Sequence, residues 1–224
     1  MAVAVFDLVP WLPLLDGIEA LTGPAAAQRA ARQRIAGNRD ALFACYALQR
    51  LWIARVLGCA PAQVELLRDD KGRPHLPDAR LHTSLSHADG RVALALTATG
   101  PVGVDLEPAA RAQDMHELEE RVAHPDERRG LPAAPAARGR ALLALWVRKE
   151  ALLKAAGIGL ELEMDRFVAP EDATLPLPGA RFGGQPVQLR PVDAGDDWMM
   201  AVAAAPGTAL RVEEHVAGPL TPGA

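Results

Sequence analysis

The sequence predicts an α+β fold built from two lobes of similar design. Segments with strand alternation and segments with helical periodicity are mixed along the 224 residues without strict alternation, which argues against a doubly wound sheet. The order strand, helix, strands occurs once before about Gly100 and once after it. We therefore expect an N-terminal lobe at residues 1–101, a C-terminal lobe at 102–216 and a short tail at 217–224.

The first lobe is expected to combine one long helix with several strands. Residues 2–9 are rich in β-forming side chains, and apolar residues recur at helical spacing over 38–57. Residues 64–69 are expected to form a strand. Strands at 81–86 and 92–98 are separated by the turn sequence HADG, which predicts a hairpin.

The second lobe is expected to begin with a strand at 102–107. After Pro108 the pattern becomes helical, and Asp114 is the expected N-cap of a first helix. A long helix is expected from about residue 135 to 156, ended by Gly157 at its C-cap. The remaining strands are expected at residues 181–192, 198–204 and 209–216.

Charge is distributed unevenly along the chain. The formal net charge of -4 argues against a general nucleic-acid binder. Six arginines and one acid lie between Arg29 and Arg55, and eight bases and three acids lie between Arg121 and Lys154. Two cationic zones in an acidic chain predict local binding sites for anions.

The N-terminus and the two cysteines indicate a cytoplasmic protein. The first residues lack the basic segment of a signal peptide and are interrupted by Pro10 and Pro13. No apolar run approaches the roughly 18 residues of a membrane span, so no membrane partner is expected. Cys45 and Cys59 have no CxxC spacing and are expected to be reduced thiols without a chemical role.

The sequence GVDLEP places two carboxylates on one face of the strand at 102–107. A period of two residues puts Asp105 and Glu107 on that face and Val104 and Leu106 on the opposite face, toward the core. Hard oxygen ligands of this kind suit Mg²⁺. Taken by itself this short motif favours the alternative, an exposed strand end with two solvated acids.

The sequence WVRKEALLKAAG places Glu150 and Lys154 one helical turn apart. As an exposed pair they would stabilise the helix by about 0.2–0.5 kcal/mol. Trp146 and Leu153 lie on the same side of the helix, so Glu150 is expected at the edge of a packed face instead of in solvent. A carboxylate there could complete a metal site with Asp105 and Glu107.

The segments KGRP and SLSH bring together side chains that suit phosphate oxygens. Their cations, hydroxyls and imidazole are Lys71, Arg73, Ser84, Ser86 and His87. Considered alone, His87 is more simply a histidine satisfied at a strand end, and His82 is expected to be structural. No His/Cys group has zinc spacing, and the sequence has neither a GxxxxGK[ST] loop nor a GxSxG elbow, which excludes several large enzyme classes.

Taken in order, KGRP, SLSH, GVDLEP and WVRKEALLKAAGIGL resemble the motifs of 4'-phosphopantetheinyl transferases of the two-lobed, surfactin-synthetase-activator type. The specific part is WxxKExxxK followed by GxGL, and the resemblance covers roughly residues 30–165. It implies two similar α+β lobes related by a pseudo-twofold axis, with the active site in the cleft between them.

The resemblance also implies a reaction and its partners. A Mg²⁺-dependent enzyme, with Mn²⁺ as the alternative ion, would use coenzyme A as substrate. It would transfer the phosphopantetheine arm to a serine of an apo acyl or peptidyl carrier protein and release adenosine 3',5'-bisphosphate. The carriers would serve fatty-acid, polyketide or nonribosomal-peptide biosynthesis. A pseudo-symmetric chain can build the whole cleft alone, so a monomer is expected.

The resemblance assigns roles to individual residues. Asp105, Glu107 and Glu150 would hold the metal. Glu150 and Lys154 would be catalytic, with Glu150 as the base for the serine and Lys154 beside the leaving phosphate; metal ligation and base duty compete for Glu150, and both stay open. The residues implied in coenzyme A binding are Arg34, Arg39, Arg68, Lys71, Arg73, Ser84, Ser86, His87, Asp105 and Lys154. His87 is expected to be protonated beside the 3'-phosphate.

One segment departs from the family pattern. The family often has a paired aromatic before SxxE, whereas this chain has RVAHPDERRG, with His124 and Glu127 as the matching positions. The basic zone there, including Arg128 and Arg129, is expected to steer an acidic carrier helix. Two other classes stay open: a non-catalytic binder of coenzyme A or carrier, and a metal-dependent phosphohydrolase acting on another diphosphate.

Overall fold

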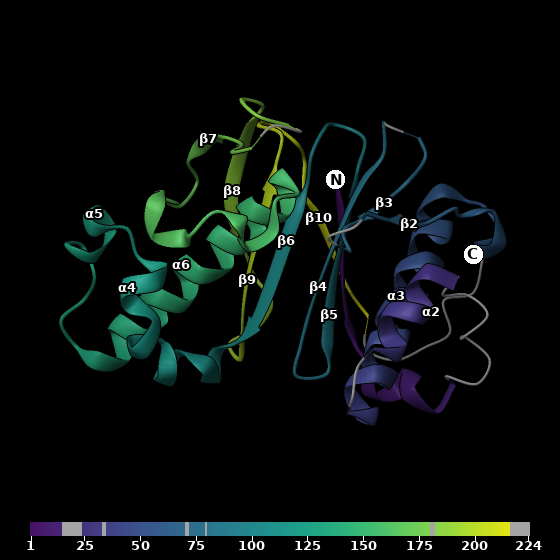
Figure 1. Ribbon diagram of the computed structural model, residues 1–224, viewed down its shortest axis with the longest axis horizontal. Helices are drawn as coiled ribbons and strands as arrows, with labels where there is room; N and C mark the ends of the chain where they lie inside the picture. Colours follow the sequence, from purple (N-terminus) through teal and green to yellow (C-terminus); the bar gives the residue numbers. More distant parts are fainter. Residues whose placement is uncertain (15–23, 33–34, 70–71, 79, 180–181, 216–224) are drawn as a thin grey trace.

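Two four-stranded sheets lie side by side, and each is covered on its outer side by helices (Figure 1). A computed structural model describes residues 1–14, 24–32, 35–69, 72–78, 80–179 and 182–215. Helix α3 (Ala36–Leu57) packs on the outer face of the first sheet, and α6 (Pro135–Ala156) packs on that of the second. This arrangement confirms the α+β class.

The first sheet has four strands in the order β10-β1-β5-β4. They are β10 (Arg211–His215), β1 (Ala2–Asp7), β5 (Arg91–Thr97) and β4 (His82–Ala88). In β1, Phe6 packs with Trp52 of α3, whereas Val5 joins a core that lies between the two sheets and contains Val104. Strand periodicity thus divides the apolar residues of the first lobe between two cores.

The second sheet is antiparallel, with the order β6-β9-β8-β7. Its strands are β6 (Gly103–Pro108), β9 (Trp198–Ala204), β8 (Pro186–Val192) and β7 (Thr174–Pro176). Helix α6 approaches β6 closely at Gly103, where an added Cβ would lie 1.9 Å from the carbonyl oxygen of Ala151. The missing side chain of Gly103 therefore fixes how near α6 lies to the strand that carries Asp105.

The remaining elements are short and lie outside the two sheets or join them. The helices are η1 (Val9–Leu14), α2 (Pro24–Ala31), η3 (Pro61–Gln63), η4 (Ala109–Leu118), α4 (Glu119–Val122), α5 (Pro125–Arg128), η5 (Gly159–Glu161) and η6 (Met164–Arg166). A small ribbon pairs β2 (Leu67–Arg68) with β3 (Pro74–His75).

Three local expectations need correction. The strand expected at 64–69 is only Leu67–Arg68, because the chain turns at Asp69, whose side chain accepts from the Arg73 amide, and Pro74 has no amide hydrogen. Asp114 lies inside η4 and is not an N-cap, because that helix begins directly after Pro108. The strand expected from residue 181 begins at Pro186, after a turn with Gly184 at φ 80.

Strand β10, counted with the second lobe in the sequence, pairs with β1 in the first sheet (Figure 1). The pairing is parallel and joins the two ends of the described chain. Gly157 ends α6 at φ 72, which confirms the expected C-cap. None of the helices in the described residues combines the length and apolar character that crossing a bilayer requires, and Cys45 and Cys59 are free.

Candidate active site

The candidate site lies where the edge strands of the two sheets meet. Ser84 Oγ on β4 accepts a hydrogen bond from the Val104 amide on β6 at 3.2 Å, and α6 covers β6. A cavity of about 810 Å³ opens at this junction and receives side chains from β4, β6 and α6. Residues far apart in the sequence are thereby brought to one surface.

Lys154 and Asp105 form the centre of this surface. Lys154 Nζ lies 2.6 Å from Asp105 Oδ1 and donates to Ser86 Oγ at 2.9 Å. Ser86 Oγ in turn donates to Asp105 Oδ1 at 2.7 Å. Asp105 is almost fully buried, and within the described residues its Oδ2 has no hydrogen-bond partner. A buried carboxylate oxygen without a donor is a candidate ligand for a cation.

Glu150 and Glu107 face the same cavity as Asp105. Burial raises the pKa of Glu150 to about 7, and the charges of Asp105 and Glu107 add to this effect. Burial and Asp105 also raise the pKa of Glu107, which Arg111 partly opposes. In the described part of the chain no three acidic, histidine or cysteine side chains already form a closed metal site. The mutual repulsion of these carboxylates and the unpaired Oδ2 of Asp105 nevertheless fit a site that accepts positive charge.

The cavity is also lined by basic residues, Arg68 and Arg73 among them. Arg68 lies over the Tyr46 ring at 3.7 Å and donates to Gln49 Oε1 and to the Gly72 carbonyl, each at 3.1 Å. Burial lowers the pKa of Arg68 to about 10, so it stays charged at neutral pH. Arg73 donates to the Ala155 carbonyl at the end of α6 and lies 4.9 Å from the Phe182 ring centre. These contacts fix two guanidinium groups that line the cavity.

His87 also lines the cavity, next to the Ser86 and Lys154 cluster. Burial lowers the pKa of His87, and the charge of Lys154 lowers it further. Without an anion beside it, His87 therefore favours its neutral form. The expectation of a protonated His87 concerns the complex with a 3'-phosphate and stays a prediction.

Most of the residues singled out in the sequence line this cavity: Arg68, Arg73, Ser84, Ser86, His87, Asp105, Glu107, Glu150 and Lys154. Arg39 does not, because it points to solvent on α3, 3.6 Å from Asp40. Arg34 and Lys71 lie outside the described residues. The cavity also contains Arg29, Asn38 and Asp89, which the sequence did not single out. The sequence features that could have predicted them are indirect: Arg29 and Asn38 belong to the first cationic zone, and Asp89 belongs to the HADG turn.

Glu127 lies away from the cavity, and its side chain makes hydrogen bonds that hold the local fold together. It accepts from the amides of His124 and Ala169 at 2.9 and 2.7 Å, and His124 caps α5. Its Oε2 also lies 2.6 Å from Lys149 Nζ, which donates to three backbone carbonyls as well. The pair His124 and Glu127 therefore forms a capping box at the start of α5, the arrangement that an SxxE sequence makes at a helix N-terminus.

Comparison with known proteins shows the family to which the chain belongs. The sequence model of the 4'-phosphopantetheinyl transferase superfamily matches residues 101–200. A 4'-phosphopantetheinyl transferase of Bacillus subtilis is 30% identical over 164 residues, which cover 70% of this chain and 70% of the relative. A phosphopantetheinyl transferase of Thraustochytrium sp. is 31% identical over 210 residues, covering 85% of this chain and 69% of the relative.

A protein of Synechocystis sp., provisionally named as a 4'-phosphopantetheinyl transferase, is 26% identical over 215 residues, covering 91% of this chain and 87% of the relative. The molecule is thus a transferase enzyme. It belongs to the 4'-phosphopantetheinyl transferase superfamily, a family whose general substrate is coenzyme A.

Proposed function

We propose that this protein transfers the phosphopantetheine arm of coenzyme A to a serine of an apo acyl or peptidyl carrier protein and releases adenosine 3',5'-bisphosphate. The observation that carries the proposal is the convergence of Asp105, Glu107, Glu150 and Lys154 on one cavity that Arg68 and Arg73 also line. Carboxylates and guanidinium groups around one cavity suit a diphosphate held between a cation and those guanidinium groups.

The arginines that line the cavity would bind the nucleotide part of coenzyme A. Arg68 and Arg73 are charged, fixed by backbone acceptors and stacked on aromatic rings, so their donors are oriented before ligand binds. His87 and Ser84 lie on the β4 wall, where they can meet the 3'-phosphate end. Arg29 adds a further cation, whereas Arg39 would reach the ligand only after leaving Asp40.

The carboxylates that line the cavity would hold Mg²⁺, with Mn²⁺ as the alternative ion. Asp105 offers an unpaired buried oxygen, and Glu107 and Glu150 repel one another and Asp105, so a dication would relieve an existing excess of negative charge. When bound, the ion would neutralise charge on the diphosphate during transfer. The shared cavity of Asp105, Glu107 and Glu150 and oxygen-ligand chemistry support this proposal.

Glu150 and Lys154 would act on the two ends of the reacting bond. A carboxylate whose pKa is raised to about 7 can accept a proton from the carrier serine near neutral pH. Lys154 Nζ, now 2.6 Å from Asp105, is placed to donate to the departing phosphate. The one-turn spacing on α6 keeps these two groups in one cavity, and both metal ligation and base duty stay open for Glu150.

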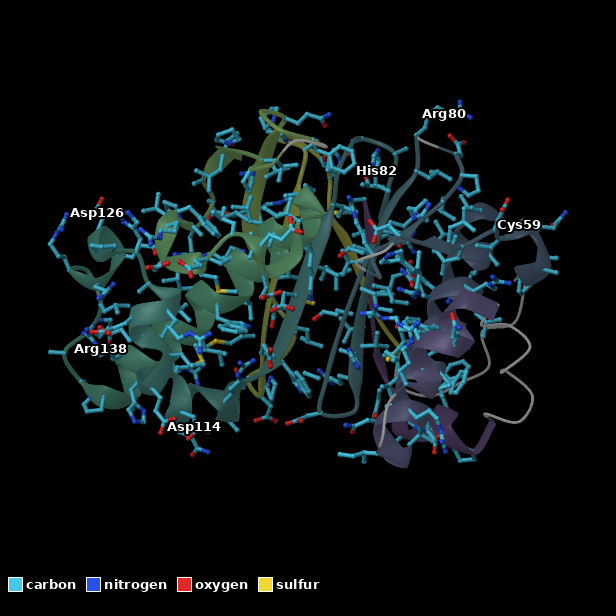
Figure 2. The ribbon with its side chains drawn as sticks, viewed as in Figure 1. Cys59, Arg80, His82, Asp114, Asp126 and Arg138 are labelled. Atoms are coloured by element: carbon cyan, nitrogen blue, oxygen red, sulfur yellow. The ribbon has the colours of Figure 1, made fainter. Side chains whose placement is uncertain are left out.

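The carrier would approach along the basic zone of α5 and α6. Arg129 is exposed and lies 2.6 Å from Asp126, which is at the outer end of the second lobe (Figure 2). Arg128 is half-buried and donates to the Ala123 carbonyl at 3.0 Å, so part of its role is to fix the loop. Arg129 is therefore the cleaner probe of steering. Described residues of a single chain line the cavity, which supports the proposal that the enzyme acts as a monomer. We also propose that it works in the cytoplasm.

One experiment separates the proposed activity from the two alternatives. The protein is incubated with coenzyme A, Mg²⁺ and an apo carrier protein, and the carrier is weighed by intact mass spectrometry. A mass gain equal to phosphopantetheine supports the transferase. Coenzyme A binding without any mass gain over several apo carriers would identify a non-catalytic binder. Cleavage of the coenzyme A diphosphate without a carrier would identify a phosphohydrolase.

A further inference from the structure

Arg111 holds Glu107 from outside the cavity. It follows β6 on η4, and its Nη1 forms a short ion pair with Glu107 Oε1 at the i, i+4 spacing. Its guanidinium also lies over the Trp146 ring of α6, 4.4 Å from the ring centre. Glu107 and Trp146 line the cavity, whereas Arg111 does not. Arg111 therefore links a cavity carboxylate to a cavity aromatic without occupying the cavity itself.

We infer that Arg111 is a positioning residue for the cation site: it fixes Glu107 through Oε1 so that the other oxygen is left for the metal. This inference rests on the proposed function. Lys154 provides the contrast, because it is on the cavity wall and pairs with Asp105 there, where a cation or phosphate would also bind. Arg111 approaches from outside the cavity, so it need not leave when the cation enters.

Trp146 makes the position of Arg111 specific. A guanidinium stacked on an aromatic face has a fixed plane, and that plane sets the direction from which it can meet a carboxylate. Trp146 is four residues before Glu150 on α6, so Arg111 connects the strand that carries Glu107 to the helix that carries Glu150. Hydrogen-bond partners behind metal-binding carboxylates typically contribute about 10–100-fold to metal affinity.

The test measures Mn²⁺ affinity directly. Binding of MnCl₂ to the protein with coenzyme A but without carrier is followed by the electron paramagnetic resonance signal of free Mn²⁺. We expect Arg111→Gln to weaken Mn²⁺ binding by about 10-fold or more. In transfer assays the Mg²⁺ concentration for half-maximal rate should rise, while saturating Mg²⁺ should restore most of kcat. The Mn²⁺ affinity of Arg111→Lys should lie between those of wild type and Arg111→Gln, since lysine keeps the charge but has no planar group to stack on Trp146.

Arg138→Gln is the matched control. Arg138 forms an ion pair with Glu119 at 2.6 Å, and its side chain is 29% exposed, close to the 31% of Arg111. It lies on the outer side of the second lobe, away from the seam between the sheets (Figure 2). Arg138→Gln should leave Mn²⁺ affinity unchanged.

Three results would overturn the inference. The first is Mn²⁺ binding that is unchanged or tighter in a folded Arg111→Gln protein, with the fold checked by circular dichroism. The second is an Arg111→Gln defect in kcat that saturating Mg²⁺ does not reduce. The third is a wild-type protein that modifies a carrier but binds no Mn²⁺. Failure of the proposed function is distinguishable, because the wild-type protein would then modify no carrier at any metal concentration.

Discussion

Lys149 Nζ lies 2.6 Å from Glu127 Oε2, and the Lys149 side chain is completely buried. The ammonium also donates to the carbonyls of Val122, Met164 and Phe167, so one lysine joins α6 to the end of α4 and to the segment around η6. Lys149→Met would remove the donor to these three carbonyls and leave Glu127 with the amides of His124 and Ala169 but without its cation. We expect the free energy of unfolding, measured by urea denaturation, to fall by about 3–5 kcal/mol. A decrease below about 1 kcal/mol would show that this buried pair contributes little to stability.

Glu150 is expected to reduce stability at neutral and higher pH. Its pKa is raised from 4.5 to about 7, so the native state binds this proton more tightly and stability falls as pH rises across that window. Without metal, Glu150→Gln should therefore be about 1–2 kcal/mol more stable than wild type at pH 8, allowing for partial screening. The difference should shrink as the pH is lowered toward 4.5. Thermal melts in chelator would check this, and equal stability at pH 8 would contradict it.

Gly103 is expected to tolerate no side chain. An added Cβ would lie 1.9 Å from the Ala151 carbonyl oxygen and 2.6 Å from the Ala155 nitrogen, so α6 would have to move. Gly103→Ala should lower the free energy of unfolding by about 1–3 kcal/mol. It should also lower the transfer rate, because α6 carries Glu150 and Lys154. Gly37→Ala in α3 is the control, since nothing lies within 4 Å of its Cβ position. Wild-type stability and rate in Gly103→Ala would contradict the close packing.

Arg129 tests carrier steering separately from coenzyme A binding. Arg129→Glu should raise the KM for the carrier several-fold, most strongly at low ionic strength, because the exposed charge would repel an acidic partner. Coenzyme A affinity, measured by calorimetry, should not change, since Arg129 does not line the cavity. Unchanged carrier kinetics at low salt would rule out this docking surface.

The long elements could be predicted from the sequence. Helix α6 begins and ends where its periodicity, Pro135 and Gly157 indicated, and β9 covers the expected seven residues. The shared face of Asp105 and Glu107 also follows from strand periodicity, and both residues line the cavity. Helix ends and strand faces can be predicted in this way because residues close in the sequence determine them.

Features that depend on distant contacts could not be predicted. Strand β10 has no local signal for pairing with β1, because its partner is at the other end of the chain. Lysine is rarely buried, so the enclosure of Lys149 was not expected from its residue type. Arg39 lies in the first cationic zone, but its position on α3 directs it to solvent, and only the packing of α3 decides which residues of that zone face the cavity.

The most direct test of the account compares wild-type protein with Glu150→Gln by intact mass spectrometry of an apo carrier protein incubated with coenzyme A and Mg²⁺. Glu163→Gln is the control, since Glu163 is exposed and paired with Arg166. We predict that wild type and Glu163→Gln convert the carrier to its phosphopantetheine form, while Glu150→Gln, although folded, gives no mass gain. Conversion of the carrier by Glu150→Gln at the wild-type rate would contradict the assignment of this cavity as the active site.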